Sequence, residues 1–340
     1  MGENKDSRGG GRSNHSVAAT TSDLKSLPEQ LRALAATSRI ANVPSVASNV
    51  CVGAVLVLGT SPFPKAKLAL AVAAGICLYF AGNFLNDWAD RDWDAARRPE
   101  RALPSGTFPP AFYLAMAAAL SLLGIGLAAE ANPASLPVAA AILALIVFYT
   151  AIHKRTAWSV IPMGLCRALL PVLGLVGCME PRAAWPGRDL LWIAGPSLAL
   201  LCHVAGLSLS ARGEATGNAS SRRQSGILFA VTAFFAAVPV FFLFAVMKAF
   251  DSNANPWWIA IPLAIYGLWI ALCETRFRTP IPRHVSNLLA GIPLVDWIFI
   301  LPLCVAVQSL TAEPVTHLLA WVPPLAFLSA KALQRLAPAT

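Results

Sequence analysis

The chain has little charge. Only 13% of its 340 residues are Asp, Glu, Lys or Arg, whereas about 25% is usual in soluble globular proteins. Apolar residues make up 56% of the chain, and the mean hydropathy is +0.61. Because each membrane-spanning helix needs roughly 20 apolar residues, the chain has room for roughly nine or ten such helices and little else. The composition therefore indicates a membrane protein and excludes a separate soluble catalytic domain.

Patterns typical of several other classes are also missing. The seven cysteines form no CxxC pair, so they indicate neither a disulfide framework nor a zinc site. No alternation of apolar and polar residues competes with the helical pattern. The net charge of +9 would suggest a nucleic-acid partner in a soluble protein. In a chain with many membrane helices it first indicates topology, and we expect no nucleic-acid partner.

A polar N-terminal segment precedes the apolar part of the chain. Residues 1–21 are rich in Gly, Ser and Asn and are predicted to form a disordered cytoplasmic tail. Residues 22–39 place leucines at helical spacing opposite charged side chains, which predicts an amphipathic helix in the membrane interface. A soluble helix packed on a loop is the alternative. Residues 40–336 are predicted to form the transmembrane domain.

Ten apolar runs make up this domain, and they predict an all-α, polytopic membrane bundle. The runs cover residues 40–58, 66–86, 110–129, 134–152, 157–178, 189–209, 226–249, 256–273, 285–307 and 315–334. Prolines interrupt the last two runs, so the count of transmembrane helices is nine or ten.

Basic residues indicate the orientation of the bundle, because cytoplasmic loops carry an excess of Lys and Arg. Twenty basic residues lie in the N-terminal segment, in alternate loops and at the C-terminus, and the opposite loops hold five. The asymmetry places the N-terminus and the charged loops in the cytoplasm. Whatever chemistry the charged loops perform, we expect it at the cytoplasmic face.

The densest acidity follows the second apolar run. Asn83, Asp87, Asp90 and Asp94 are spaced by four, three and four residues, so on a continuous helix they share one face, with Asn86 on its flank. Aligned carboxylates repel one another unless a cation lies between them. Carboxylate and amide oxygens suit Mg²⁺, which takes one or two carboxylates together with substrate phosphate oxygens. The sequence therefore predicts a magnesium site at this helix end.

Arginines come directly after the acidic residues. Arg97, Arg98 and Arg101 precede a Pro-Ser-Gly turn at residues 104–106. Guanidinium groups present planar forks that match phosphate oxygens. Together with the acidic residues they predict a site that binds a phosphate through a metal while the apolar remainder of the ligand lies among the helices. The alternative is a solvated loop whose charges neutralise one another.

The same segment resembles the UbiA superfamily of intramembrane prenyltransferases. Its residues NDWADRDWD fit the pattern NDxxDxxxD, and RRPERALPSG is similar to the continuation that follows it in that family. The later run FYTAIHKRTAW resembles the end of the family's fourth helix. The resemblance implies a helical bundle around a central cavity, and transfer of a prenyl group from an isoprenyl diphosphate to a lipophilic, typically aromatic acceptor with Mg²⁺.

The resemblance also implies roles for individual residues. The expected metal ligands are Asn86, Asp90 and Asp94, with Asp87 beside them, and Asp90 and Asp94 are the expected catalytic residues. The expected diphosphate contacts are Arg98, Arg101, Lys154 and Arg155. The expected lining of the cavity near the acceptor is Asn83, Tyr149 and His203. Asp296 is a further candidate for the cavity wall, although His203 and Asp296 could equally be hydrogen-bonded interior residues.

One departure from the family pattern lies at the end of the sixth run. Family enzymes carry a second pair of aspartates there, whereas this chain has only Glu214, preceded by Ser208 and Ser210. One carboxylate with two hydroxyls is a poorer metal site, so Glu214 is predicted to hold a second ion less firmly. This motif, with GLCRALLPVLG in the fifth run, resembles the EboC-type branch of bacterial UbiA-like proteins encoded with secondary-metabolite genes. We therefore expect a bacterial inner membrane protein.

Arg167 lies inside the fifth apolar run. An unpaired charge at that depth costs on the order of 2.5–3.5 kcal/mol, so Arg167 is expected to face the cavity as a further catalytic residue. Its expected partner is the diphosphate or Glu214. The alternative is an arginine that extends to the membrane surface.

Two functions remain open at this point. The first is Mg²⁺-dependent prenyl transfer within the membrane. The second is a non-catalytic or transport homologue that binds a prenyl or diphosphate lipid for a secondary-metabolite pathway, and the altered second motif favours it.

Overall fold

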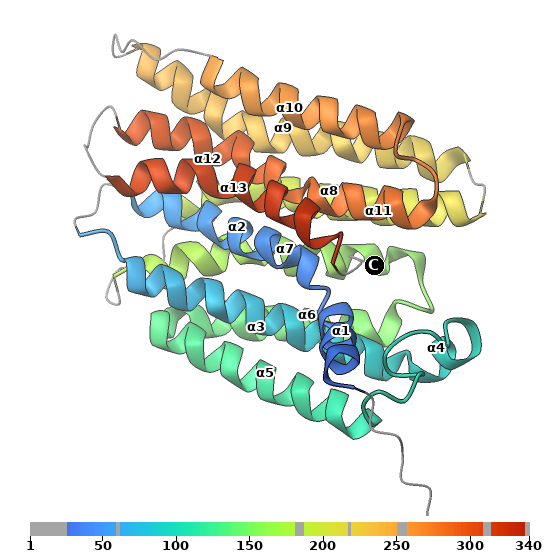
Figure 1. Ribbon diagram of the computed structural model, residues 1–340. Coiled ribbons are helices and arrows are strands. Elements are labelled where there is room, and N and C mark those ends of the chain that lie inside the picture. The colour runs from blue at the N-terminus through green and yellow to red at the C-terminus, as the bar shows by residue number, and fades with distance from the viewer. Residues whose placement is uncertain are drawn as a thin grey trace, which may run out of the picture.

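The computed structural model describes residues 26–58, 62–180, 187–216, 219–249, 257–308 and 314–336. Within these ranges the regular elements are all helices (Figure 1). The tail predicted to be disordered, residues 1–21, lies outside them.

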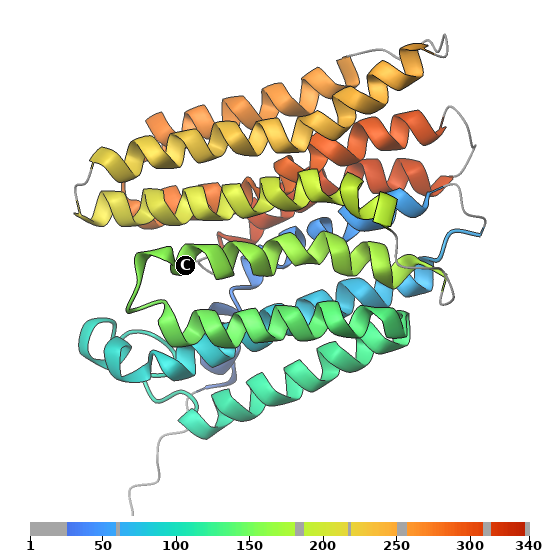
Figure 2. The same cartoon turned by 180° about the vertical axis from the view of Figure 1, so that it is seen from behind.

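Ten long helices in the described part of the chain run side by side (Figures 1 and 2). They are α2 (Val43–Ala54), α3 (Lys65–Ala89), α5 (Pro110–Ala131), α6 (Leu136–Ile152), α7 (Val160–Cys178), α8 (Gly187–Thr216), α9 (Ala219–Ala249), α10 (Trp257–Thr275), α12 (Ile292–Gln308) and α13 (Pro314–Leu333). Three shorter helices are α1 (Leu27–Thr37), α4 (Arg91–Arg97) and α11 (Ile281–Ala290). Nine of the ten apolar runs each correspond to one of the long helices, and the run at 285–307 covers the end of α11 and most of α12.

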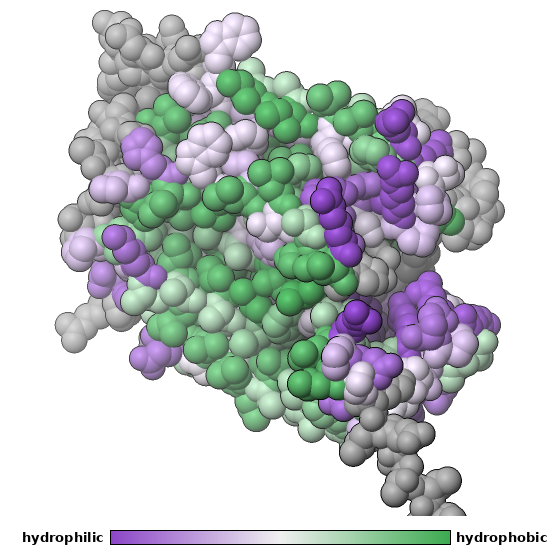
Figure 3. Space-filling view, in the orientation of Figure 1, coloured by the Kyte–Doolittle hydropathy of each residue, from purple (hydrophilic) through white to green (hydrophobic). Residues whose placement is uncertain are grey.

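The dimensions of these helices suit a lipid bilayer. In the described residues, 8 segments are long and apolar enough to cross a membrane, and one of them joins α11 to α12 as Ile281–Ala306. α10 contributes a shorter apolar segment, Ala260–Thr275, and α13 packs against α12 and α2. Apolar residues cover the middle of the surface, and hydrophilic residues gather at the end that carries α1 and α4 (Figure 3). The prediction of an all-helical membrane bundle is confirmed.

Helix α1 has a different direction from the long helices (Figure 1). It begins with a capping box, in which Ser26 and Glu29 satisfy backbone N–H groups at the helix start. Leu34 packs on Phe84 and Tyr113 at the end of the bundle, whereas Leu27 and Leu31 remain exposed. The helix lies within the range predicted to be amphipathic, and its place in the membrane interface stays a prediction.

Helices α2 and α7 cross closely because glycine stands at two points of contact. A Cβ added to Gly174 would overlap the backbone oxygen of Val50, and one added to Gly53 would overlap that of Pro171. Any larger residue would force the two backbones apart. This close crossing brings the side chain of Arg167 against α2, where it meets its hydrogen-bond partners.

The acidic segment is not one continuous helix, as the residue spacing had suggested. Helix α3 ends at Ala89, Asp90 takes φ −86° and ψ −1°, and α4 follows in another direction (Figure 1). Only Asp94 of α4 is buried, so the change of direction leaves the charged side chains of Arg91, Asp92 and Arg97 toward solvent. Asp94 therefore approaches the end of α3 from a separate helix.

Candidate functional site

A cavity of about 390 Å³ lies inside the bundle, between α3, α6, α7, α8 and α11. Most of its wall is apolar, with side chains such as Ile146, Leu170 and Leu289. Asn83 and Tyr149, two of the residues expected near the acceptor, belong to its lining. An apolar cavity with a few polar groups suits a ligand that is mainly hydrocarbon and carries one polar end.

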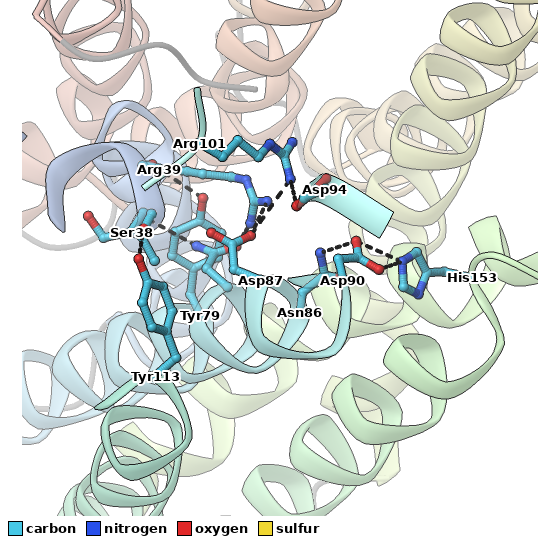
Figure 4. Close-up of polar contacts among 12 residues, drawn as sticks. Ser38, Arg39, Tyr79, Asn86, Asp87, Asp90, Asp94, Arg101, Tyr113 and His153 are labelled. Carbon is cyan, nitrogen blue, oxygen red and sulfur yellow. Dashed lines mark hydrogen bonds and ion pairs between the residues drawn. The ribbon is translucent and has the colours of Figure 1, made fainter. Parts of the chain in front are cut away.

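Charged residues gather at the end of α3 (Figure 4), and one of them, Arg39, belongs to the lining of this cavity. We call this group the outer cluster. It consists of the carboxylates of Asp87, Asp90 and Asp94 and the basic side chains of Arg39, Arg101, His153 and Lys154.

Asp94 is the most buried carboxylate of the outer cluster, with only 2% of the residue exposed. Its Oδ2 accepts a hydrogen bond of 2.8 Å from Nη1 of Arg101. The same Nη1 lies 4.0 Å from Oδ1 of Asp87. Arg101 therefore connects the carboxylate on α4 with the one on α3, as Figure 4 shows.

Asp87 is held mainly by Arg39. Nη2 of Arg39 donates a 3.1 Å hydrogen bond to Oδ1 of Asp87, and its Nη1 donates a 2.6 Å bond to Oδ1 of Asn83. The amide of Asn83 in turn donates to the backbone oxygen of Ser38 at 2.9 Å. These contacts fasten the segment before α2 to the end of α3 (Figure 4).

Asp90 faces two basic residues that follow α6. Nε2 of His153 lies 3.1 Å from its Oδ1, and Nζ of Lys154 lies 3.1 Å from its Oδ2. Burial alone would raise the pKa of the Asp90 carboxyl, but the hydrogen bonds and charges of His153 and Lys154 outweigh it and hold this pKa below its ordinary value. Asp90 is therefore an anion at neutral pH.

The sequence interpretation missed Arg39 and His153. Arg39 lies more than forty residues before its partners, and it had been counted only as a topology signal. The structure gives it φ 47° and ψ 51°, a left-handed conformation that few residues other than glycine adopt. The sequence did contain a signal for His153, because it follows Tyr149, an expected cavity residue, by one helical turn. In the structure their rings lie 5.1 Å apart.

The structure changes the argument for a metal. The carboxylates were expected to need a cation between them, but protein side chains offset each one, and the described residues contain no group of three His, Cys, Asp or Glu that could hold an ion. Oδ1 of Asn86 and Oδ1 of Asp94 are nevertheless buried without a hydrogen-bond partner among the described residues. Because buried acceptors are normally satisfied, these oxygens fit a Mg²⁺ ion whose other ligands are substrate phosphates and water.

Three other expected site residues lie outside the cluster. Arg98 and Arg155 are exposed, and the guanidinium of Arg98 lies 5.7 Å from the ring centre of Trp93. Glu214 belongs to α8 but lies in a stretch whose side chains fall outside the structure's description. In the described part of α8, Ser208 bonds to its own helix at Val204 and Ser210 bonds to His284.

His203 and Asp296 are not among the described residues that line this cavity. His203 is fully buried beside it: its Nε2 lies 3.0 Å from the backbone oxygen of Leu288, so this nitrogen donates, and its Nδ1 accepts from the hydroxyl of Tyr266 at 3.1 Å. Asp296 is fully buried against Ser48 and Asn49. Both are hydrogen-bonded interior residues, because polar groups within an apolar bundle need such partners.

Arg167 does line the cavity, as expected, but its partners differ from the expected ones. Its Nη1 donates to Oγ of Ser45 at 3.0 Å and to Oδ1 of Asn49 at 3.1 Å. Its guanidinium carbon lies 5.2 Å from the ring centre of Tyr79. The residue is buried and its partners lie on α2 inside the bundle, so it is not an arginine that extends to the membrane surface.

Comparison with known proteins gives the family. The model of the UbiA prenyltransferase family matches residues 46–285. The chain belongs to this family. Among curated relatives, the digeranylgeranylglyceryl phosphate synthases of Methanopyrus kandleri and Natronomonas pharaonis are 34% and 32% identical over 120 and 126 residues, which is 35% and 37% of this chain. The 4-hydroxybenzoate octaprenyltransferase of Ralstonia nicotianae is 39% identical over 71 residues, 20% of this chain and 24% of its own length.

These sequence similarities are partial, since the two archaeal synthases are matched over only 43% and 45% of their own lengths. Solved structures extend the similarity of the fold. A digeranylgeranylglyceryl phosphate synthase aligns over 83% of this chain and 99% of its own, with a TM-score of 0.55 and 16% identity. A UbiA homologue from Aeropyrum pernix aligns over 76% of this chain and 96% of its own, with a TM-score of 0.55 and 21% identity. The resemblance to the EboC-type branch stays a prediction.

Proposed function

We propose that this UbiA-family membrane protein transfers a prenyl group from an isoprenyl diphosphate to a lipophilic acceptor. The observation that carries the proposal is that the cavity and the outer cluster share a residue. Arg39 lines the largely apolar cavity and also pairs with Asp87 of the outer cluster, which presents both carboxylates and cations. A prenyl diphosphate has the same division, with a hydrocarbon chain and a charged end. The curated relatives bear the names of prenyl-transferring enzymes, which supports the same activity here.

The basic residues of the outer cluster have the chemistry to bind the diphosphate. Arg101 offers a planar fork of N–H donors, and Lys154 offers a point charge. Both are within 3.1 Å of carboxylates in the structure, so a diphosphate would compete with Asp94 and Asp90 for them. Arg39 lies one step deeper, beside Asn83, where it can contact the end of the diphosphate nearest the prenyl chain.

We further propose that Asn86, Asp90 and Asp94 hold Mg²⁺ together with the substrate phosphates. The bound ion would offset the charge that develops on the leaving diphosphate. As the bond between carbon and oxygen breaks, both electrons stay with the diphosphate, and the acceptor forms a new bond to the allylic carbon and loses a proton. The apolar side chains around the cavity keep water away, which prevents hydrolysis of the prenyl group.

The orientation proposed from the basic residues places the outer cluster at the cytoplasmic face of the membrane, where a soluble diphosphate can reach it. We propose a bacterial inner membrane as the location, on the resemblance to the EboC-type branch.

A second candidate is a binder that holds a prenyl diphosphate without turnover. Its support is the described end of α8, where Ser208 and Ser210 stand in place of the second pair of aspartates. Their hydroxyls bond to Val204 and His284 and supply no negative charge for a second ion. Such a protein would bind the diphosphate in a Mg²⁺-dependent way and release no free diphosphate.

The test uses membranes that contain the full chain, labelled geranylgeranyl diphosphate, Mg²⁺ and a panel of phenolic and glyceryl acceptors. We expect Asp94→Asn to lower the transfer rate at least about 100-fold, because Asp94 would supply a buried carboxylate oxygen to the ion that offsets the charge on the leaving diphosphate. The matched control is Asp92→Asn, whose side chain is 89% exposed and two residues away. It should retain the wild-type rate. Equal rates for wild type and Asp94→Asn would contradict the catalytic role, and binding without any transfer would favour the second candidate.

A further inference from the structure

A second polar group lies deeper in the bundle than the outer cluster. We call it the inner cluster, and it consists of Ser45, Ser48 and Asn49 on α2, Arg167 on α7 and Asp296 on α12. The amide nitrogen of Asn49 donates to both carboxylate oxygens of Asp296, at 3.0 and 2.8 Å, and Ser48 donates to Oδ2 at 2.5 Å. The carbonyl oxygen of Asn49 accepts from Arg167. Asn49 thus bridges the cation and the anion.

This bridge keeps the two charges apart. Among the described residues, no carboxylate lies within the 4.0 Å of an ion pair from Arg167, since Ser45 and Asn49 occupy the hydrogen-bonding positions of Nη1. A guanidinium has five N–H donors, and these two bonds use the donors of Nη1 alone. Its Nε and Nη2 donors make no hydrogen bond to a described residue, and the side chain is part of the cavity wall. The cavity wall therefore contains a fork of donors with room for a ligand.

Arg167 lies beside a residue of α3 that precedes the outer cluster along the chain. Its guanidinium carbon lies 5.2 Å from the ring centre of Tyr79, which precedes Asp87 by eight residues and Asp90 by eleven. At 1.5 Å per residue, the backbone of Tyr79 lies about 12 and 16 Å before theirs along the helix axis. The outer cluster also has its own cations, Arg101 and Lys154, in direct contact with Asp94 and Asp90. Arg167 is therefore available to another part of the bound substrates.

The chemistry of that part follows from the cost of a buried cation. An arginine within the membrane is retained when it has an anionic or strongly accepting partner. A prenyl chain offers no such atom, so the partner belongs to the acceptor. Carboxylates and phosphates match the planar fork of a guanidinium with two parallel hydrogen bonds. Asp296, held at one remove by Asn49, balances the charge of Arg167 without covering its donors.

We infer that Arg167 is a specificity-determining residue that binds an oxyanion of the acceptor, a carboxylate or a phosphate. Asp296 is a positioning residue that acts on Arg167 through Asn49. The inference rests on the proposed function, because it names the acceptor class of the same cavity.

The test compares acceptors that differ only in the anion. One pair is 4-hydroxybenzoate and 4-hydroxybenzamide, and the other is geranylgeranylglyceryl phosphate and geranylgeranylglycerol, so the two pairs distinguish a carboxylate from a phosphate. The full chain in lipid nanodiscs should prefer the anionic member of one pair at least tenfold in kcat/KM. Arg167→Gln should remove this preference and leave the KM for geranylgeranyl diphosphate unchanged, and Arg167→Lys should restore part of it. Equal use of both members by the wild type, or a raised KM for the diphosphate in Arg167→Gln, would overturn the inference.

The role of Asp296 has its own readout. Asp296→Asn should raise the KM for the anionic acceptor about three- to tenfold while kcat and the KM for the diphosphate stay the same, a split that a general loss of packing would not give. Ser48→Ala serves where Asp296→Asn fails to fold, because it removes one donor to the Asp296 carboxylate and leaves Asn49 in place. It should raise the KM for the anionic acceptor in the same direction by about two- to threefold. An unchanged KM for the anionic acceptor in both variants would contradict the assignment.

A binding measurement separates failure of this inference from failure of the proposed function. If the wild type transfers no prenyl group, the proposed function fails, and thermal unfolding with each acceptor still tests Arg167. The wild type should be stabilised by the anionic member of one pair and not by its neutral counterpart, and Arg167→Gln should lose that shift. Equal shifts for both members, or none, would overturn the inference independently of catalysis.

Discussion

The outer and inner clusters both contain buried cations and carboxylates, but they arrange them differently. In the outer cluster, cations and carboxylates touch, as Arg101 and Asp94 do at 2.8 Å and Lys154 and Asp90 at 3.1 Å. In the inner cluster, Asn49 separates Arg167 from Asp296. Direct pairs can be exchanged for a ligand of high charge, and in the proposed function a diphosphate with Mg²⁺ would replace both partners. Because Asn49 stands between Arg167 and Asp296, Arg167 keeps N–H donors that no described residue takes up and that can bind one anion.

The two clusters also differ in how fully their polar atoms are satisfied. Asn86 and Asp94 in the outer cluster each have a buried oxygen without a partner among the described residues, whereas the amide and carboxylate of Asn49 and Asp296 are fully engaged. Unsatisfied groups cost stability and are retained where a ligand completes them. We therefore expect the outer cluster to depend mainly on a ligand. The inner cluster also stabilises the fold.

The same substitution in both clusters tests this difference most strongly. Asn86→Leu should lower the prenyl transfer rate about 100-fold, because it removes an oxygen that is expected to bind the ion. Thermal unfolding should change little, because this oxygen has no hydrogen-bond partner among the described residues. Asn49→Leu should lower the free energy of unfolding by about 1–3 kcal/mol, because Arg167 and Asp296 lose their common partner. Thermal unfolding in detergent and the transfer assay, run on both variants, give the two readouts. Loss of stability in Asn86→Leu alone would reverse the comparison.

A smaller effect distinguishes the arginines within the outer region. Arg101→Gln should raise the KM for the prenyl diphosphate about tenfold, equivalent to about 1.4 kcal/mol, because it removes the cation that connects Asp94 and Asp87. Arg98→Gln is the matched control, since Arg98 is exposed beside Trp93, and its KM should stay within about twofold of the wild type. Steady-state kinetics with varied diphosphate measures both. Equal KM values for the two variants would contradict the prediction that Arg101, which contacts the carboxylates, binds the diphosphate and Arg98 does not.

Much of the fold could be predicted from the sequence, because membrane helices depend on long apolar runs. In the described structure nine of the ten runs each correspond to one long helix, and the ninth run is divided between α11 and α12. The acidic motif and Arg101 were predicted from a local pattern within about twenty residues. The end of α3 at Ala89 was not, because spacing alone does not show where a helix changes direction.

The remaining parts of the site depend on contacts between distant segments. Arg39 reaches Asn83 across 44 positions, and Asn49 reaches Asp296 across 247. No periodicity links such residues, so the inner cluster and the role of Arg39 required the structure. The side chain of Arg155 is exposed, whereas that of its neighbour His153 contacts Asp90. The expected contact between Arg155 and a diphosphate stays a prediction.

The most direct test of the two-cluster account is a structure of the full chain in a nanodisc with Mg²⁺ and a non-hydrolysable prenyl thiodiphosphate. The account predicts phosphate density at Arg101 and Lys154, with Asn86, Asp90 and Asp94 facing the ion and with Arg167 still bonded to Asn49. Phosphate density on Arg167 would contradict it.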